Sequence, residues 1–143
     1  MQIEEYFHGK SCVVTGAASG IGFAVTEALL KAGAAVLMAD RDTKTLGAAV
    51  GQLSTHGDRL HSTNVDVTNQ EQVQSMVAEA VSRQGRIDVL FNNAGVGGTL
   101  PIGEATLEHW RRIIGINLWG VIYGAHAALP LMRRQGSGHI VNT

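Results

Sequence analysis

Cysteine is almost absent from this chain of 143 residues, which contains only Cys12. An internal disulfide is therefore excluded. The apolar neighbours Val13 and Val14 favour a buried thiol over a reactive one, and a lone cysteine suits the reducing cytoplasm. The residues that follow Met1 also lack the basic end and apolar run of a signal peptide. We therefore expect a cytoplasmic protein.

Runs of one charge are lacking as well. Lys and Arg total 11 against 12 Asp and Glu, which argues against a nucleic-acid partner held by phosphate contacts. The six histidines show no metal-ligand spacing, so no metal site is expected. Repeats, low-complexity tracts and domain linkers are also missing, and the length suits one domain over residues 1–143.

One long segment has no charge at all. Residues 113–132 contain no Asp, Glu, Lys or Arg and are long enough to cross a bilayer. Asn117, His126 and Pro130 lie within the segment, together with three glycines, and such residues are unfavourable in lipid. We therefore favour a buried helix and no membrane partner.

Apolar strands alternate along the chain with segments of helical periodicity, which is typical of a parallel sheet covered by helices. The first helical segment has one apolar face, formed by Ile21, Ala24, Val25, Ala28, Leu29 and Ala32. Thr68 and Glu71 have the spacing of a capping box. The expected strands are residues 10–15, 34–39, 59–65, 87–91 and 139–143, and a long helix is expected from a cap at Thr106 to about residue 134.

A glycine-rich turn follows the first expected strand. Thr15–Gly22 reads T-G-x-x-x-G-x-G, which differs from the G-x-G-x-x-G dinucleotide pattern but meets similar physical demands. Gly16 permits a tight turn, Gly20 lets the backbone approach a pyrophosphate, and Gly22 lets the helix pack near the strand. Free N–H groups at the helix start would face the phosphates, and a purely structural turn is the weaker alternative. The candidate residues for pyrophosphate binding are Gly16, Ser19, Gly20, Ile21 and Gly22.

Carboxylates follow the second and third expected strands. Asp40 can accept hydrogen bonds from an adenosine ribose and repel a 2′-phosphate, although it is also placed to cap a helix, a role that Asp42 fits better. Arg41 complicates the cofactor assignment, because its guanidinium could reach a 2′-phosphate. Asp66 can accept from the adenine amino group while Val67 covers the ring, or Asp66 can serve as a turn former. NAD is therefore favoured over NADP.

The fourth expected strand runs into the sequence Asn92-Asn93-Ala94-Gly95. The carboxyl ends of parallel strands share one edge of a sheet, and open α/β sheets bind ligands at that edge. The glycine turn, the two carboxylates and this segment all follow strands. Their agreement predicts one nucleotide site, to which Asn93, Ala94 and Gly95 also contribute.

These motifs resemble those of the short-chain dehydrogenase/reductase family over essentially the whole chain. The resemblance implies an α/β fold with a Rossmann-type doubly wound parallel sheet, here truncated after the fifth strand. It also implies hydride transfer between a nicotinamide cofactor and a small-molecule alcohol or carbonyl substrate. The matching segments are the cofactor motif at Thr15–Gly22, the adenine-contacting pair Asp66-Val67, the N-N-A-G motif at Asn92–Gly95, the catalytic-helix asparagine Asn117, and the fifth strand at 138–142.

The chain departs from the family pattern in its catalytic residues. The family carries a serine just beyond such a fifth strand and a Tyr-x-x-x-Lys pair further on, and of its catalytic four this sequence contains only Asn117. Tyr6 and Lys10 have the Tyr-x-x-x-Lys spacing, but they precede the first strand, so we interpret that match as accidental. We therefore expect residues 1–143 alone to be inactive, and a non-catalytic nucleotide-binding module is the alternative.

Two further expectations concern the long helix. Asn117 should disturb the regular helix and direct its backbone carbonyl at the site, as the family suggests, with Gly115 and Gly120 easing the distortion. The alternative is that Asn117 is a polar residue whose side chain is hydrogen-bonded within a buried helix. In the family this helix helps to build a dimer or tetramer interface, so we expect a homo-oligomer formed through the helix at 106–134.

Overall fold

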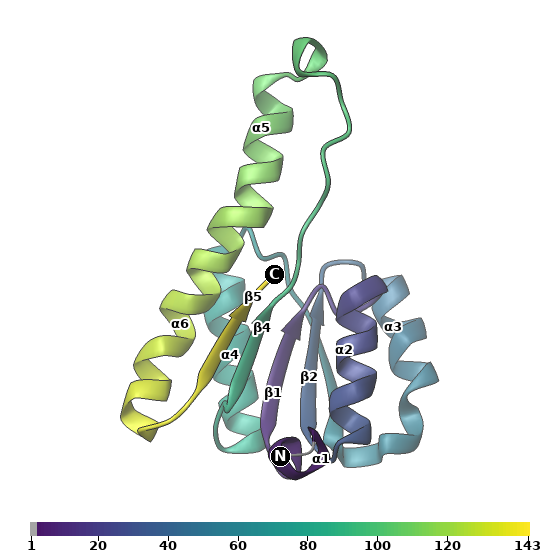
Figure 1. Ribbon diagram of the computed structural model, residues 1–143, viewed down its shortest axis with the longest axis vertical. Helices are drawn as coiled ribbons and strands as arrows, with labels where there is room; N and C mark the ends of the chain where they lie inside the picture. Colours follow the sequence, from purple (N-terminus) through teal and green to yellow (C-terminus); the bar gives the residue numbers. More distant parts are fainter. Residues whose placement is uncertain (1–2) are drawn as a thin grey trace.

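The computed structural model describes residues 3–143 and contains one five-stranded sheet with helices on both faces (Figure 1). Neighbouring strands are all parallel, in the order β3-β2-β1-β4-β5. The predicted doubly wound parallel sheet is thereby confirmed. In chain order the elements are α1 (Ile3–Phe7), β1 (Ser11–Thr15), α2 (Gly20–Lys31), β2 (Ala35–Asp40), α3 (Thr43–Gln52), the 3-10 helix η1 (Ser54–Arg59), β3 (Leu60–Asn64), α4 (Gln70–Gln84), β4 (Val89–Asn92), the 3-10 helix η2 (Ile102–Glu104), α5 (Leu107–Ile114), the π-helical turn η3 (Gly115–Trp119), α6 (Gly120–Gln135) and β5 (His139–Asn142).

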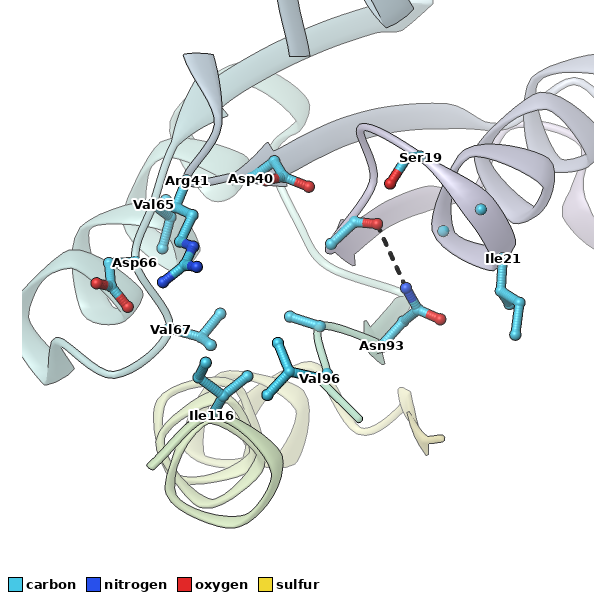
Figure 2. A pocket seen from close by; sticks show the side chains of 15 residues that line it. Ser19, Ile21, Asp40, Arg41, Val65, Asp66, Val67, Asn93, Val96 and Ile116 are labelled. Carbon is cyan, nitrogen blue, oxygen red and sulfur yellow. Dashed lines mark hydrogen bonds between the residues drawn. The ribbon is translucent and has the colours of Figure 1, made fainter. Parts of the chain in front are cut away.

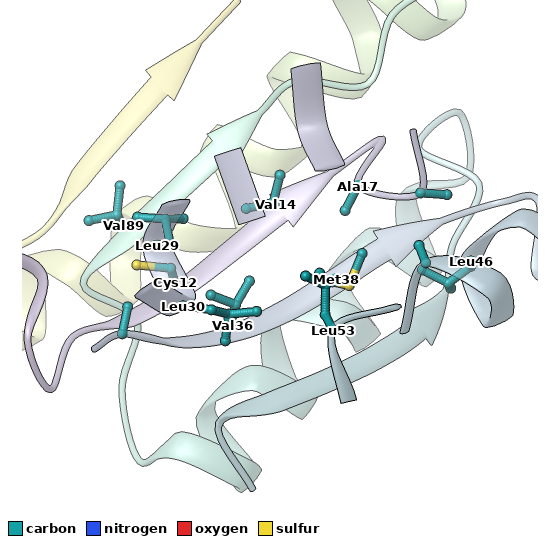
Figure 3. Close-up of a cluster of buried hydrophobic side chains, with 13 residues drawn as sticks. Cys12, Val14, Ala17, Leu29, Leu30, Val36, Met38, Leu46, Leu53 and Val89 are labelled. Atoms are coloured by element: carbon teal, nitrogen blue, oxygen red, sulfur yellow. The ribbon is translucent and has the colours of Figure 1, made fainter. Parts of the chain in front are cut away.

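The central strand β1 is buried along its whole length, which explains why its sequence is apolar at consecutive positions. Cys12 and Val14 pack against the face covered by α2 and α3, shown in Figure 3, whereas Val13 packs against the face covered by α4 and α6. The thiol of Cys12 is fully buried, and this burial raises its pKa to about 12. The prediction of a buried cysteine is confirmed.

The predicted cap at Thr106 is confirmed, and a glycine ends α4. Thr106 caps α5 by accepting a hydrogen bond at Oγ1 from His109 N (3.3 Å), and His109 Nδ1 accepts from Thr106 N (3.0 Å) in return. Gly85 ends α4 with a left-handed φ of 78°, a conformation that glycine adopts without strain.

The capping box predicted from Thr68 and Glu71 is wrong. Helix α4 instead begins after Asn69, whose Oδ1 accepts from Gln72 N at 3.1 Å. The N–H and hydroxyl of Thr68 both donate to Asp66 Oδ1, at 2.9 and 2.7 Å. Thr68 is therefore held in a turn by the preceding carboxylate, and the helix starts one residue later.

The apolar face predicted for α2 is confirmed only in part. Leu29 and Ala32 are buried and Val25 is half-buried against the core, but the other three residues are exposed. Ile21 is 71% exposed, and Ala24 and Ala28 are exposed as well. The buried residues of α2 are Gly22, Thr26, Leu29 and Leu30. In the first turn of α2, Gly22 lies so close to Gly16 O and Asn93 Nδ2 that a Cβ would have no room, and its neighbour Ile21 lies on the outward side.

Helices α5 and α6, joined through η3, form one continuous run from Leu107 to Gln135 that projects beyond the sheet at its α5 end (Figure 1). The expectation of a buried helix is wrong, because only 22% of its most apolar 18-residue window is buried. With a mean hydropathy of 1.3 in that window, this run is long and apolar enough to cross a membrane on length and composition alone. The residues that are buried repeat every four positions, and they are Ile116, Gly120, Gly124, Ala128 and Met132.

Candidate nucleotide-binding site

A cavity of about 400 Å³ lies at the carboxyl edge of the sheet (Figure 2). Every residue that the sequence nominated for cofactor binding lines this cavity. The sequence missed three apolar lining residues, Val65, Val96 and Ile116. The nominated residues are Gly16, Ser19, Gly20, Ile21, Gly22, Asp40, Arg41, Asp66, Val67, Asn93, Ala94 and Gly95.

The start of α2 faces this cavity without a side-chain cap. Helices α3, α4 and α5 each have a capping side chain, whereas Ser19, the N-cap of α2, makes no such bond. The first intrahelical bond of α2 runs from Phe23 N to Ser19 O at 3.2 Å, so the N–H groups of residues 20–22 precede the helical ladder. Gly20 has a φ of 55°, and a Cβ there would meet nothing within 4 Å. This arrangement suits an anion at the helix start.

The glycine turn is braced by the segment after β4. Asn93 Nδ2 donates to Thr15 O at 3.0 Å, and the backbone N–H groups of Asn93 and Ala94 both donate to Thr15 Oγ1 at 3.0 Å. A Cβ on Gly22 would lie 2.1 Å from Gly16 O and 2.6 Å from Asn93 Nδ2. The turn therefore keeps its shape because backbone, an amide side chain and two glycines pack in direct contact.

Asp40 links the glycine turn to the end of β2. Its Oδ2 accepts from Ala18 N at 3.1 Å, and its Oδ1 accepts from Asp42 N at 3.0 Å. Asp42 caps α3 by accepting from Thr45 N at 3.0 Å, as predicted. Hydrogen bonds from Thr45 also hold the pKa of Asp42 below its usual range. Asp40 is thus free of the capping role and lies in the cavity wall.

The opposite wall is formed by Arg41 and the segment after β3. In Figure 2 the guanidinium of Arg41 extends towards Asp66 and Val67, whereas the carboxylate of Asp40 is directed towards the glycine turn. The two hydrogen bonds that Asp66 accepts from Thr68 show that the turn-forming role left open by the sequence is real. Asp66 therefore combines that role with a place in the cavity wall.

Asn117 lies in the π-helical turn η3, which confirms the predicted disturbance of the helix. Its Oδ1 accepts from Val96 N and its Nδ2 donates to Val96 O, both at 2.8 Å. The alternative, in which the side chain is hydrogen-bonded within its own helix, is wrong, because both hydrogen bonds are made to the backbone of the loop after β4. Asn117 does not line the cavity itself, but its neighbour Ile116 and its partner Val96 do.

A second cleft, of about 440 Å³, lies between the loop at 96–105 and α5. Val96 lines both this cleft and the first cavity. The walls of the second cleft include Leu100, Trp110 and Ile113. An apolar space thus adjoins the candidate nucleotide site, with the backbone held by Asn117 at their junction.

A parallel sheet with a glycine-rich turn at an open helix start, and a carboxylate at the end of the next strand, defines a dinucleotide-binding α/β protein. The chain belongs to the short chain dehydrogenase family, whose model matches residues 10–143. Proteins of this family are oxidoreductases that depend on NAD or NADP, and the predicted family is confirmed.

Individual relatives agree with this assignment. The chain is 38% identical over 134 residues to 3beta-hydroxysteroid dehydrogenase 2 of Eggerthella lenta, covering 93% of this chain and 52% of that protein. It is 37% identical over 137 residues to 1-deoxy-11-beta-hydroxypentalenate dehydrogenase of Streptomyces exfoliatus, covering 94% and 50% respectively. A short chain dehydrogenase/reductase from Burkholderia phymatum, solved in complex with NAD, is similar with a TM-score of 0.91 and 36% identity, covering 95% of this chain and 49% of that one. The chain thus spans about half the length of these relatives.

Proposed function

We propose that residues 1–143 form the nicotinamide-dinucleotide-binding domain of an oxidoreductase that transfers hydride between NAD and an alcohol or carbonyl substrate. The observation that carries this proposal is the uncapped start of α2, which opens into a cavity lined by every nominated residue. Unpaired N–H groups at a helix start favour phosphate. The family membership of the chain supports the same function.

The residues present fit such a cofactor. The N–H groups of residues 20–22 would hold the pyrophosphate, and Asp40 would accept hydrogen bonds from the adenosine ribose. Val67 would cover the adenine, with Asp66 accepting from its amino group. The bound cofactor would supply or accept the hydride, and these residues would fix its orientation.

The geometry favours NAD over NADP. The carboxylate of Asp40 would repel a 2′-phosphate, and the guanidinium of Arg41 extends away from it, towards Asp66 (Figure 2). Arg41 is therefore better placed beside the adenine than beside a phosphate on the ribose.

Titration calorimetry tests this choice. We expect NAD to bind more tightly than NADP, and Asp40→Ala to weaken NAD binding about 10–100-fold, since a hydrogen bond to a charged group contributes about 1.5–3 kcal/mol. Asp58→Ala is the matched control, because Asp58 is exposed and does not line the cavity. Tighter binding of NADP, or NAD affinity unchanged in Asp40→Ala, would contradict the proposal.

The second cleft supports a substrate with an apolar body. It adjoins the cofactor cavity at Val96 and carries Leu100, Trp110 and Ile113 in its wall. The names of the two curated relatives describe hydroxyl groups on a steroid and on pentalenate. We therefore propose an alcohol or ketone on an apolar skeleton as the substrate class.

The long helix supports self-association. Its exposed apolar side chains exceed what a monomer usually leaves open to water, and we propose that a homo-oligomer in the cytoplasm covers them. Size-exclusion chromatography with light scattering should then give a mass above that of one chain. The exposed apolar side chains of this helix are Leu107, Trp110, Ile114, Leu118, Trp119, Ile122 and Leu129.

A further inference from the structure

The Tyr6-x-x-x-Lys10 spacing, which plays no part in the proposed function, corresponds to a cluster at the amino edge of the sheet. Tyr6 Oη is hydrogen-bonded to His139 Nδ1 at 2.6 Å, across 133 positions of sequence. Lys10 Nζ lies 5.6 Å from the centroid of the Tyr6 ring. We propose that α1 is a latch, in which Tyr6 fixes the start of β5 through His139 and so sets the register of that strand.

Strand β5 depends on such a contact because burial specifies its register only weakly. The strand has four residues, of which His139 and Asn142 are exposed and Ile140 and Val141 are half-buried. Among residues 3–143 it pairs with β4 alone. A slip of one residue would exchange the two faces of a strand, and the half-buried pair opposes this less than a buried core would.

The latch itself is anchored to the rest of the molecule. Phe7 packs against the buried cluster beneath α2 and α3, and its ring meets that of Tyr6 edge-on, with centroids 4.9 Å apart. Gly9 N donates to Gly33 O at 3.0 Å, which ties the end of α1 to the end of α2. Phe7 and Gly9 thus tie the segment that carries Tyr6 to the rest of the molecule, which positions Tyr6 as a partner for His139.

Asp88 connects the latch to the central strands. It is only 6% exposed, and its carboxylate accepts from Ser11 N at 2.9 Å and pairs with Arg86 at 2.8 Å and with Lys10 at 3.9 Å. The backbone O of Asp88 accepts from His139 N at 2.8 Å. The side chain of His139 is therefore held by Tyr6, and its backbone is held separately by Asp88.

The other end of β5 reaches the nucleotide-binding edge. Asn92 Nδ2 donates to Asn142 Oδ1 at 2.9 Å, and Thr143 N donates to Asn92 O at 3.2 Å. Thr143 Oγ1 donates to Asn93 Oδ1 at 3.4 Å, and Asn93 braces the glycine turn. Tyr6 is thus a positioning residue, which acts on the site through the register of one strand.

Amide hydrogen exchange measured by NMR on the full chain tests the latch. In Tyr6→Phe we expect the amides of His139 and Thr143 to exchange about fivefold faster, since one net hydrogen bond contributes about 1 kcal/mol. The amides of α4 should keep their rates, and the ¹⁵N shift of His139 Nδ1 should change. Tyr123→Phe is the control, because the Tyr123 ring packs on Trp119 and its hydroxyl has no hydrogen-bond partner among residues 3–143. It should leave the β5 rates unchanged.

A double substitution distinguishes loss of the Tyr6–His139 hydrogen bond from a general destabilisation of the fold. If Tyr6 and His139 act through one contact, His139→Phe should accelerate exchange in β5 by a similar factor, and adding Tyr6→Phe should have little further effect. Multiplicative effects of the two substitutions, equal acceleration in all strands, or unchanged β5 rates in Tyr6→Phe would each overturn the latch.

Discussion

Gly22 is a residue whose missing side chain has a clear structural consequence. A Cβ there would lie 2.1 Å from Gly16 O, so only glycine lets α2 approach the turn this closely. The helix lies with Thr26 and Leu29 inward and Ile21 outward. The absence of a Cβ at Gly22 thus permits the close approach of this face of α2.

Gly22→Ala should lower the free energy of unfolding by about 1–3 kcal/mol, because the inserted methyl group has no space. Gly47→Ala is the matched control, since Gly47 lies within α3 and a Cβ there meets nothing within 4 Å. It should raise stability by about 0.5–1 kcal/mol through helix propensity. Chemical denaturation of the two variants measures both effects. Equal responses would contradict the packing described at Gly22.

At the same scale, the sequence predicted all the polar and glycine residues of the cavity and three apolar ones, Ile21, Val67 and Ala94, but missed three other apolar residues. Glycines and carboxylates at strand ends are unusual enough to stand out, and all of those nominated line the cavity. Val65, Val96 and Ile116 also line it, yet in a sequence such residues look like any other core positions. The direction of the Arg41 side chain could not be predicted either, because it depends on the neighbouring segment after β3.

Among the elements, the π-helical turn η3 has the clearest link to the site. It places Asn117 opposite Val96, where one amide side chain bonds both the N–H and the C=O of the loop. The π-turn thereby fixes the start of the loop that separates the two cavities.

Asn117→Ala should release this loop. We expect the Val96 amide to exchange about fivefold faster or more, because its only acceptor within residues 3–143 is removed and one net hydrogen bond contributes about 1 kcal/mol. Leu118→Ala serves as the control, since Leu118 lies in the same turn and is 53% exposed. Exchange at Val96 that is equal in the two variants would show that Asn117 does not hold the loop.

The positions of the helices and strands were largely predictable from the sequence. The buried faces of the helices and the residues that cap them were harder to predict. The periodicity located all five strands and the helix from Thr106, because buried strands and helix caps leave local signals. Part of the face of α2, at Ile21, Ala24 and Ala28, and the cap of α4 were predicted wrongly. The first depends on the contact between Gly22 and the turn, and the second on the bonds between Asp66 and Thr68, and neither is visible in local periodicity.

For the whole molecule, the alternation of strands and helices predicted the parallel sheet, but it did not predict the exposure of the long helix. Apolar composition predicted burial of residues 113–132, and most of the helix is exposed in the chain described. Composition shows that a helix is apolar, but it does not show whether the rest of the same chain covers that helix.

Residues 1–143, assayed alone, should form no NADH from alcohols above background. Proton transfer at the substrate oxygen needs a positioned acid or base, whose loss costs about 10²–10⁴-fold in rate. Of the two tyrosines, Tyr6 is bonded to His139 at the opposite edge of the sheet and Tyr123 packs on Trp119. If the purified chain formed NADH clearly and the Asp40→Ala variant did not, the proton-transfer role would instead belong to a residue within 1–143.

The binding of a dinucleotide at the carboxyl edge of the sheet is tested most directly by titrating the ¹⁵N-labelled chain with NAD and mapping the amide shifts. We predict saturable shifts at residues 20–22, 40–42, 66–68 and 93–95, with the largest at the start of α2, where the N–H groups precede the helical ladder. Amides of α3 and of the latch at Tyr6 should not move. Absence of saturable shifts, or shifts confined to the loop at 97–105 and the exposed face of α6, would contradict a nucleotide site at this edge.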